Sequence, residues 1–342
     1  MRDRIALVTG ASGFIGRWVV GALRRRGVLV RAGIHRLSHI ASFPRDHGVE
    51  VARLDLLDKQ SLVRAMDGVD AFYHFAALID PKAQSEDHFQ INAEGTKNLW
   101  TCAAACSVRA ALYCSSASVY GLLSSSSQPI TEDVRPRAVE PYGRSKLLGE
   151  STALEIGAQS GPATVVIRPV AVFGPGDQSP FGRSFRRAAV SRLLFAGAFR
   201  GRKFSFVHVE DVAEAAVHLM QSDACNGQAY NVSVEDPISF ECAFQAYTRA
   251  LIRSGRSQVR ARLLARLSAV AQKLPVLSHL LSTLGGERLV FTVWQPGFDM
   301  TYSSEKLLRT SFQFKWTRFE DVVLPWINEK HVSTYHASSG ER

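Results

Sequence analysis

The feature that most constrains this chain is a glycine-rich segment, TGASGFIG, at residues 9–16. It follows a short apolar run and opens residues 14–27, whose apolar side chains recur at helical spacing. In such a strand–loop–helix unit, Gly10 allows a tight turn. Gly13 lets the backbone approach a pyrophosphate, and Gly16 lets the helix pack closely on the strand. Because the first N–H groups of a helix are free to face an anion, the segment predicts a dinucleotide-binding site.

The first half of the chain continues this alternation of short apolar runs and helical patterns. The expected strands are residues 5–10, 28–34, 49–56, 70–78, 110–116 and 163–169. The expected helices are residues 14–27, 58–66, 88–106 and 142–161. Continuous apolar strands that alternate with helices form parallel sheets covered on both faces. The predicted fold class is therefore α/β, a Rossmann doubly wound parallel sheet with a smaller C-terminal substrate lobe.

The length of 342 residues, 46% of them hydrophobic, is enough for one large and one smaller domain. We expect residues 1–175 to form the NAD(P)-binding Rossmann domain, to which residues 206–226 return. Residues 176–205 and 227–330 would form the substrate-binding lobe, and the polar tail 331–342 would be flexible.

Composition favours a cytoplasmic protein. The five cysteines show no Cys-x-x-Cys spacing, which predicts neither a disulfide framework nor a metal site. The N-terminus lacks the layout of a signal peptide, and no apolar run of about 18 residues predicts a transmembrane helix. The net charge of +10 is compatible with a nucleic-acid partner, but no nucleic-acid recognition motif accompanies it, so we expect none.

The end of the second expected strand bears on the choice of cofactor. An acidic residue there binds the ribose 2′-hydroxyl of NAD, whereas a basic residue accepts the 2′-phosphate of NADP. Residues 31–45 contain no acid, and His35 and Arg36 stand at the position in question. This favours NADP(H), with NAD(H) as the alternative if Arg36 is only a solvated surface charge.

The glycine loop resembles the fingerprint of the extended short-chain dehydrogenase/reductase family, which includes NAD(P)-dependent epimerases and dehydratases, 3β-hydroxysteroid dehydrogenases and dihydroflavonol reductase-like enzymes. Further segments resemble the family's motifs in the same order as in the family. They are LDLLD (54–58), HFAAL (74–78), INAEGTKNL (91–99), SSASVYG (115–121), RPVAVFGPGD (168–177) and FVHVEDVAEA (206–215).

This resemblance, together with the glycine loop and the second strand, gives an expected set of residues around the cofactor. The set is Gly10, Ser12, Gly13, Phe14, Ile15, His35, Arg36, Asp55, Leu56, Ala76, Ala77, Asn92, Tyr142, Lys146, Pro169 and Val170. The resemblance also implies that Ser116 is catalytic and hydrogen-bonds the substrate oxygen. It implies a homodimer that pairs through residues 88–106 and 142–160.

Tyr142 and Lys146 stand as Tyr-x-x-x-Lys in an expected helix, one turn apart on the same face. A nearby ammonium favours the phenolate and would draw the tyrosine pKa towards neutrality. Tyr142 would then be the general acid/base, with Lys146 lowering its pKa and binding the nicotinamide ribose. The alternative is a buried helix tyrosine beside a surface lysine. Of the other polar residues, we expect His74 and His208 to be structural and Asp211 to cap a helix.

Two features bear on the substrate. Epimerases of this family typically carry an arginine, which holds a diphosphate, at the position of Phe204. In this chain the nearest basic residue is Lys203, one residue out of register. Other basic residues are available to an anion, namely Arg183, Arg186 and Arg187. Residues 242–286 hold basic and apolar side chains and no acid, which indicates either a lid over the substrate or peripheral membrane contact through 256–285.

These features predict an NAD(P)-dependent oxidoreductase that interconverts a secondary alcohol and a ketone on a hydrophobic substrate, such as a steroid-like molecule, a lipid or a secondary metabolite. The alternative is a nucleotide-sugar epimerase or dehydratase with tightly bound NAD.

Overall fold

A computed structural model describes residues 5–43, 47–121, 128–190, 201–222, 225–254 and 299–328. Within these ranges the main sheet has seven parallel strands in the order β10-β6-β5-β4-β1-β2-β3. Their bounds are β1 Ile5–Thr9, β2 Leu29–Ile34, β3 Val49–Arg53, β4 Ala71–His74, β5 Ala110–Cys114, β6 Ala163–Pro169 and β10 Ala229–Val232. The strand order reverses between β1 and β4, as in a doubly wound sheet, so the predicted fold class is confirmed.

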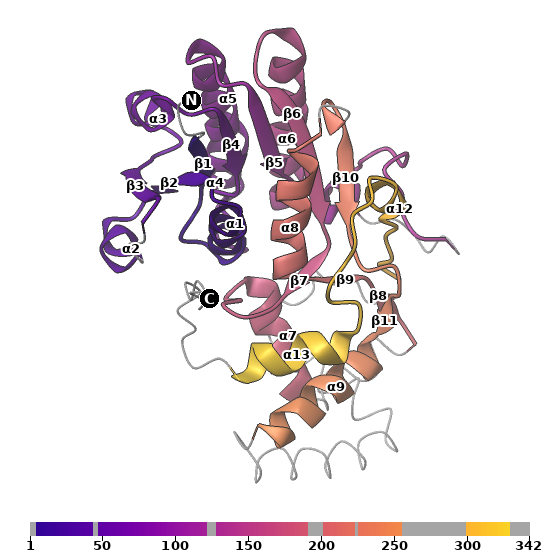
Figure 1. Ribbon diagram of the computed structural model, residues 1–342. Helices are drawn as coiled ribbons and strands as arrows, with labels where there is room; N and C mark the ends of the chain where they lie inside the picture. Colours follow the sequence, from indigo (N-terminus) through magenta and orange to yellow (C-terminus); the bar gives the residue numbers. More distant parts are fainter. Residues whose placement is uncertain are drawn as a thin grey trace.

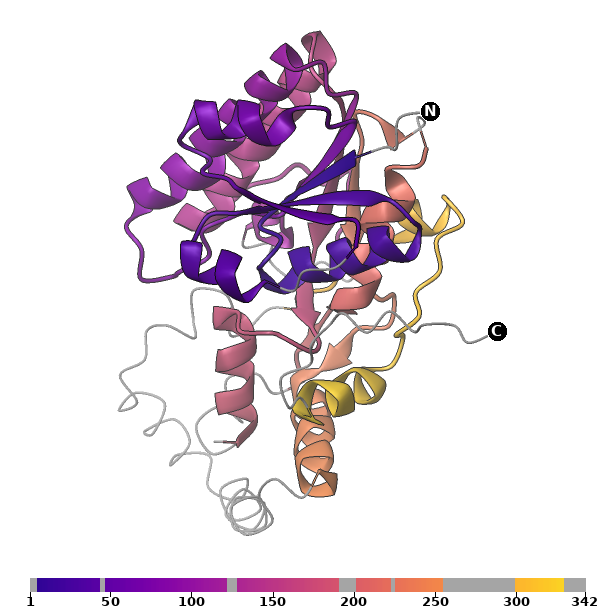
Figure 2. The same ribbon diagram turned by 60° about the vertical axis from the view of Figure 1, so that its left-hand side comes forward.

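Helices cover both faces of this sheet (Figures 1 and 2). One face packs against α1 (Phe14–Arg25) and α8 (Val209–Leu219), which contact each other. The other packs against α3 (Lys59–Met66), α5 (Gly95–Ala105) and α6 (Pro141–Gln159). Shorter helical segments are α2 Leu37–Ser42, α4 Ser85–Phe89, the π-helical η1 Gln90–Glu94, the 3₁₀ turn η2 Ala117–Tyr120 and α12 Glu305–Leu308. Both faces of the central strands are therefore buried, which is why these strands are mainly apolar, whereas the edge strand β3 exposes Glu50 and Arg53.

A smaller lobe lies below the sheet in Figure 1. Its helices are α7 Pro180–Val190, α9 Phe240–Arg253 and α13 Phe319–Asn328, and its short strands are β7 Ala171–Phe173, β8 Lys203–Phe204, β9 Phe206–His208 and β11 Ile238–Ser239. A separate aromatic cluster fills this lobe, with Phe173 and Phe185 fully buried at its centre. The ring centroids of these two residues are 5.1 Å apart in an edge-on arrangement.

The predicted strands end too late in several places. Residues 49–56 and 70–78 were expected as strands, whereas β3 ends at Arg53 and β4 at His74. The residues that follow form loops at the carboxyl edge of the sheet, where their apolar side chains cannot be distinguished from strand residues by pattern. The helix expected at 88–106 starts three residues earlier, at Ser85, and contains the π-helical turn η1.

Three expectations from the sequence stay predictions, namely the division into two domains and the roles of two segments. β10 falls in the range assigned to the lobe but pairs with β6 at the edge of the main sheet; the division into two domains stays a prediction. The basic segment 256–285 and the tail 331–342 lie outside the described residues. Among the ranges given above, no helix is both long enough and apolar enough to cross a membrane.

Candidate functional site

The glycine loop between β1 and α1 has the geometry that its sequence predicts. Gly10 adopts a positive φ of 65°, and a Cβ atom there would lie 2.6 Å from the backbone nitrogen of Ala76. A Cβ on Gly16 would lie 2.2 Å from the carbonyl oxygen of Gly10. Only glycine fits either position, because both contacts are with backbone atoms that cannot move aside. The loop is therefore held tightly against β4 and α1.

The N-terminus of α1 is left open to an anion. Gly13 is its N-cap residue, no side chain caps it, and its first turn carries no acidic residue. The first N–H groups of such a helix point outward with a positive partial charge. Phe14 and Ile15 open the helix itself. This cradle fits the pyrophosphate of a dinucleotide, which Gly10, Ser12 and Gly13 would hold.

Residues expected around the adenosine meet at the ends of β2 and β3. The His35 Nε2 lies 3.5 Å from Asp55 Oδ2, so these two side chains face each other. The Ser12 hydroxyl lies 3.4 Å from Nδ1 of His39, which joins the first loop to the start of α2. Arg36 is the exposed residue that precedes α2. The residues expected around the adenosine are therefore neighbours, and the basic residues His35 and Arg36 lie on the surface.

The loop after β4 is tied to the same edge of the sheet. The amide of Ala76 donates to Thr9 Oγ1 at 3.3 Å. Thr9 Oγ1 also lies 2.7 Å from His74 Nδ1, and His74 Nε2 lies 3.1 Å from the Thr96 hydroxyl. Burial holds the pKa of His74 well below its ordinary value, so the ring is neutral. The expectation that His74 is structural is confirmed.

Asn92 lies in the π-helical turn η1, and its side chain forms hydrogen bonds with the loop after β4. The Oδ1 atom accepts from the Leu78 amide at 2.7 Å, and the Nδ2 atom donates to the Leu78 carbonyl at 2.9 Å. The Nδ2 atom also donates to the Ser145 hydroxyl at 3.1 Å. A π-turn often marks a functional position. Here it lets Asn92 connect the loop after β4 to α6, the helix that carries Tyr142.

The expected catalytic residues meet where β5 ends. Ser116 is the N-cap of η2, and its hydroxyl accepts from the Ser118 amide at 3.1 Å. Tyr142, near the start of α6, has a hydrogen bond to the Ser116 side chain that lowers its pKa. Burial is the larger effect, however, and raises the pKa of Tyr142 above its ordinary value. The ring of His88 stands edge-on to that of Tyr142, with centroids 6.2 Å apart.

Lys146 is buried one helical turn beyond Tyr142, with 2% of its surface exposed. Its ammonium nitrogen lies 4.2 Å from the centre of the Tyr113 ring. Burial lowers the pKa of Lys146 to about 8, and the neighbouring Cys114 and Glu150 act against this. The alternative of a surface lysine is therefore wrong.

The expected lowering of the Tyr142 pKa is wrong for the chain on its own. The sequence predicts a tyrosine pKa drawn towards neutrality, whereas the pKa of Tyr142 is raised. The reason is that burial removes water from the phenolate and costs more than the Ser116 hydrogen bond recovers. The chain's own groups thus hold Tyr142 as a neutral phenol, the form that donates a proton.

Comparison with known proteins identifies the family of this chain. The model of the NAD dependent epimerase/dehydratase family matches residues 6–233. The chain belongs to this family. The prediction of an extended short-chain dehydrogenase/reductase, an NAD(P)-dependent oxidoreductase, is confirmed at the level of family and class.

Two curated relatives and one solved structure illustrate the range of this family. A 3β-hydroxysteroid dehydrogenase/Δ5→4-isomerase of Mycobacterium tuberculosis is 29% identical over 69% of this chain and 67% of its own length. An uncharacterized protein, y4nG, of Sinorhizobium fredii is 31% identical over 63% of this chain, and the chain spans only 52% of that protein. The UDP-glucose 4-epimerase of Thermus thermophilus in complex with NAD is 23% identical, covers 95% of this chain and 98% of its own, and has a TM-score of 0.69.

Family members of the epimerase type are expected to carry an arginine where this chain has Phe204. Phe204 is 1% exposed and stacks on Phe240 in the lobe, with ring centroids 4.5 Å apart. Arg186 donates to the Asp177 carbonyl at 3.0 Å, and Arg183 donates to the Gln178 carbonyl. The side chain of Arg187 is outside the structure's description. The arginines that are described are thus tied to the loop before α7.

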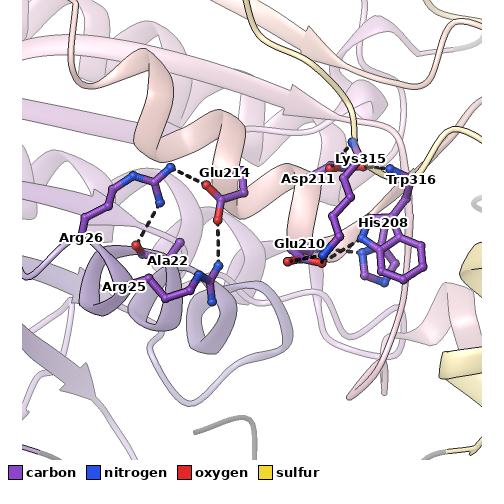
Figure 3. A network of polar contacts seen from close by, with 9 residues as sticks. All are labelled: Ala22, Arg25, Arg26, His208, Glu210, Asp211, Glu214, Lys315 and Trp316. Carbon is purple, nitrogen blue, oxygen red and sulfur yellow. Dashed lines mark hydrogen bonds and ion pairs between the residues drawn. The ribbon is translucent and has the colours of Figure 1, made fainter. Parts of the chain in front are cut away.

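In this family member a seam of polar contacts joins α8 to the segment that leads into α13 (Figure 3). The sequence predicts that Asp211 caps α8, but in the structure it does not. Its carboxylate accepts from the amides of Lys315 and Trp316, both at 3.0 Å. His208 is the cap instead, because its Nδ1 atom accepts from the Glu210 amide at 3.2 Å. The His208 ring lies against Trp316, with centroids 4.4 Å apart, so its expected structural role is confirmed.

His208 makes stability depend on pH. Burial lowers its pKa from 6.5 to about 4. Because the unfolded histidine binds a proton first, His208 contributes stability above pH 6.5 that is lost as the pH falls towards 4. In His208→Asn, an asparagine keeps the cap and does not titrate. We expect the wild type to lose up to about 3 kcal/mol of unfolding free energy relative to this variant between these pH values.

Urea unfolding of both proteins across this pH range measures that difference. Asp211, whose pKa burial raises to about 6, is present in both proteins and cancels in the comparison. A difference that stays constant with pH would contradict the assignment of a buried, neutral His208.

Several residues near the site were not predicted from the sequence. Tyr113 and Cys114, at the end of β5, lie beside Lys146. Burial raises the pKa of Cys114 to about 12, so it stays a neutral thiol. His88 lies at hydrogen-bond distance from the carbonyls of Leu78 and Asp80, at 3.2 and 3.1 Å. The family motifs do not include these positions; the one available signal was their closeness in sequence to Ser116 and Asn92.

Proposed function

We propose that this protein reduces a ketone to a secondary alcohol, and catalyses the reverse oxidation, on a hydrophobic substrate. The observation that carries the proposal is that Ser116 lies beside Tyr142, one helical turn before the buried Lys146, at the sheet edge that also holds the glycine cradle. Lys146 places a positive charge one turn from the phenol, and Ser116 places a hydroxyl beside it. These groups can bind a carbonyl oxygen and transfer a proton to it.

In this reaction a bound reduced nicotinamide supplies the hydride to the carbonyl carbon. Tyr142 donates its phenolic proton to the carbonyl oxygen, which becomes the hydroxyl of the product. Ser116 holds that oxygen during the transfer. Lys146 stabilises the tyrosinate that remains, and water then returns the proton. Because the pKa of Tyr142 is raised, its phenol is in the proton-donating form at neutral pH.

Two observations support a hydrophobic substrate over a nucleotide sugar. The position where epimerases carry a diphosphate-binding arginine holds Phe204, which is buried among aromatic rings. The named relative from Mycobacterium tuberculosis is a 3β-hydroxysteroid dehydrogenase. We therefore include steroid-like and long-chain lipid ketones in the proposed substrate class.

The test is a substrate panel assayed with both nicotinamide cofactors. A 3β-hydroxysteroid, a long-chain secondary alcohol and the corresponding ketones are compared with UDP-glucose. We expect a net change of nicotinamide absorbance with at least one apolar member and none with UDP-glucose. Turnover of UDP-glucose to its epimer without net absorbance change would favour the epimerase alternative instead.

We further propose that Arg36 gives a preference for NADP(H) by binding the 2′-phosphate. Arg36 is exposed beside His35, at the edge where the adenosine ribose would lie. A charge-assisted hydrogen bond of this kind contributes about 1.5–3 kcal/mol, so Arg36→Ser is expected to weaken NADPH binding about 10- to 100-fold. NADH binding, which lacks that phosphate, should not change. Fluorescence titration of both cofactors decides this, and a wild type that prefers NADH would contradict it.

A further inference from the structure

One buried cluster outside the expected site ties the two catalytic segments together. Arg168 on β6 is 6% exposed and is bound by the carboxylate of Glu150 on α6, whose side chain is 4% exposed. The Arg168 Nε atom donates to Glu150 Oε2 at 3.2 Å, and its Nη2 atom donates to Oε1. Two charges are removed from water here, and each is compensated by the other.

The remaining nitrogen of this guanidinium, Nη1, contacts the turn that follows Ser116. The Arg168 Nη1 atom donates to the Tyr120 hydroxyl at 2.8 Å, and its guanidinium carbon lies 5.1 Å from the centre of that ring. The Tyr120 hydroxyl in turn donates to Asn231 Oδ1 at 2.8 Å. Tyr120 is fully buried and is the last residue of η2, the turn that Ser116 caps.

Glu150 lies on the same face of α6 as the expected catalytic residues. It follows Lys146 by four residues and Tyr142 by eight, so all three recur at the helical period. The start of α6 also touches the turn directly, because a Cβ atom on Gly143 would lie 2.7 Å from the Ser118 carbonyl oxygen. The turn is thus held at both ends, by α6 at one and by Arg168 at the other.

From this geometry we propose that Arg168, acting through Tyr120 and Glu150, is a positioning residue that fixes Ser116 relative to Tyr142. Its guanidinium is buried and bound by Glu150 and Tyr120, so we expect it to act on the site through these two residues. Its guanidinium joins the Ser116 turn to the helix that carries the proton donor. The proposal rests on the proposed function, since it gives the Ser116–Tyr142 pair its geometry.

Tyr120→Phe tests this with the smallest change. It removes the hydroxyl between Arg168 and the turn, and it leaves the Arg168–Glu150 pair intact. With the most active substrate of the panel above, we expect kcat to fall about 10-fold and cofactor affinity to stay unchanged. The pH midpoint of kcat should rise, because the Ser116 hydrogen bond lowers the pKa of Tyr142 and its loss removes that effect. The other titratable neighbours of Tyr142 are unaltered, namely Tyr113, Cys114, Glu140, Lys146 and His88.

Tyr230→Phe is the matched control, because Tyr230 is a buried tyrosine on β10 next to Asn231 and faces the other side of the strand. It should keep the wild-type kcat and pH midpoint. Arg168→Lys, which keeps the charge but cannot bridge Glu150 and Tyr120, should resemble Tyr120→Phe.

The proposal is overturned if Tyr120→Phe keeps the wild-type kcat and pH midpoint, or if Tyr230→Phe changes them equally. A purely structural role would lower the melting temperature and leave the pH midpoint in place, which would also overturn it. The variant Tyr142→Phe distinguishes a failure of the positioning role from a failure of the proposed function. If that variant is fully active, the proton-transfer assignment fails; if it is inactive while Tyr120→Phe is normal, only the positioning role fails.

Discussion

Tyr142→Phe is expected to lower kcat by a factor of about 10² to 10⁴, the usual contribution of a general acid or base. The substitution removes the proton donor and keeps the ring that packs beside His88. Cofactor binding should be unchanged, because the glycine cradle and Lys146 are untouched. Steady-state kinetics with the best substrate of the panel measures the loss, and titration with NADPH measures the binding.

Tyr73→Phe provides the control for this experiment. Tyr73 is a buried tyrosine of β4 that packs in the core on the α1 face of the sheet, where Arg26 is a charged neighbour. It should leave kcat unchanged. If Tyr142→Phe retains full activity, the proton must take another route and the assignment of Tyr142 is wrong.

Glu150→Leu is expected to cost about 3–5 kcal/mol of unfolding free energy, because it leaves the Arg168 charge buried without a partner. Arg168→Met should cost a similar amount for the converse reason. The double variant should be more stable than either single variant, since both charges are then gone and an apolar pair fills the space. Chemical denaturation of the four proteins gives the coupling energy between the two sites.

A surface ion pair gives the matched control. Glu305 and Arg309 are one turn apart in and just after α12, 2.6 Å from each other, with side chains 65% and 74% exposed. Glu305→Ala should cost less than about 1 kcal/mol, because solvent screens this pair. Single variants of the buried pair that are no less stable than Glu305→Ala would contradict the account of the buried charges.

The parts of the site that were predicted from sequence are those with short-range patterns. Gly10 and Gly16 stand at fixed offsets in one loop, and Tyr142 and Lys146 are one helical turn apart. The raised pKa of Tyr142 was not predictable, because it depends on burial by groups from distant segments. Local spacing identifies the pair, and the tertiary structure sets its protonation.

The supporting residues were missed because their contacts are distant in sequence. Tyr120 and Arg168 are 48 positions apart, and Tyr120 and Asn231 are 111 apart. An arginine inside the apolar run VVIRP was a visible signal that a buried charge needs a partner. Its partner, Glu150, could not be chosen from the sequence, since any acidic residue of a neighbouring helix was eligible.

The proposed reaction is net hydride transfer from a nicotinamide cofactor to an apolar ketone, with Tyr142 as the proton donor. The most direct test follows nicotinamide absorbance over many turnovers with the ketone and alcohol forms of a 3β-hydroxysteroid, in parallel with UDP-glucose. We predict a stoichiometric absorbance change with the apolar substrate that is lost in Tyr142→Phe. Conversion of UDP-glucose to its epimer with no net absorbance change, and no reaction with any apolar member of the panel, would contradict it.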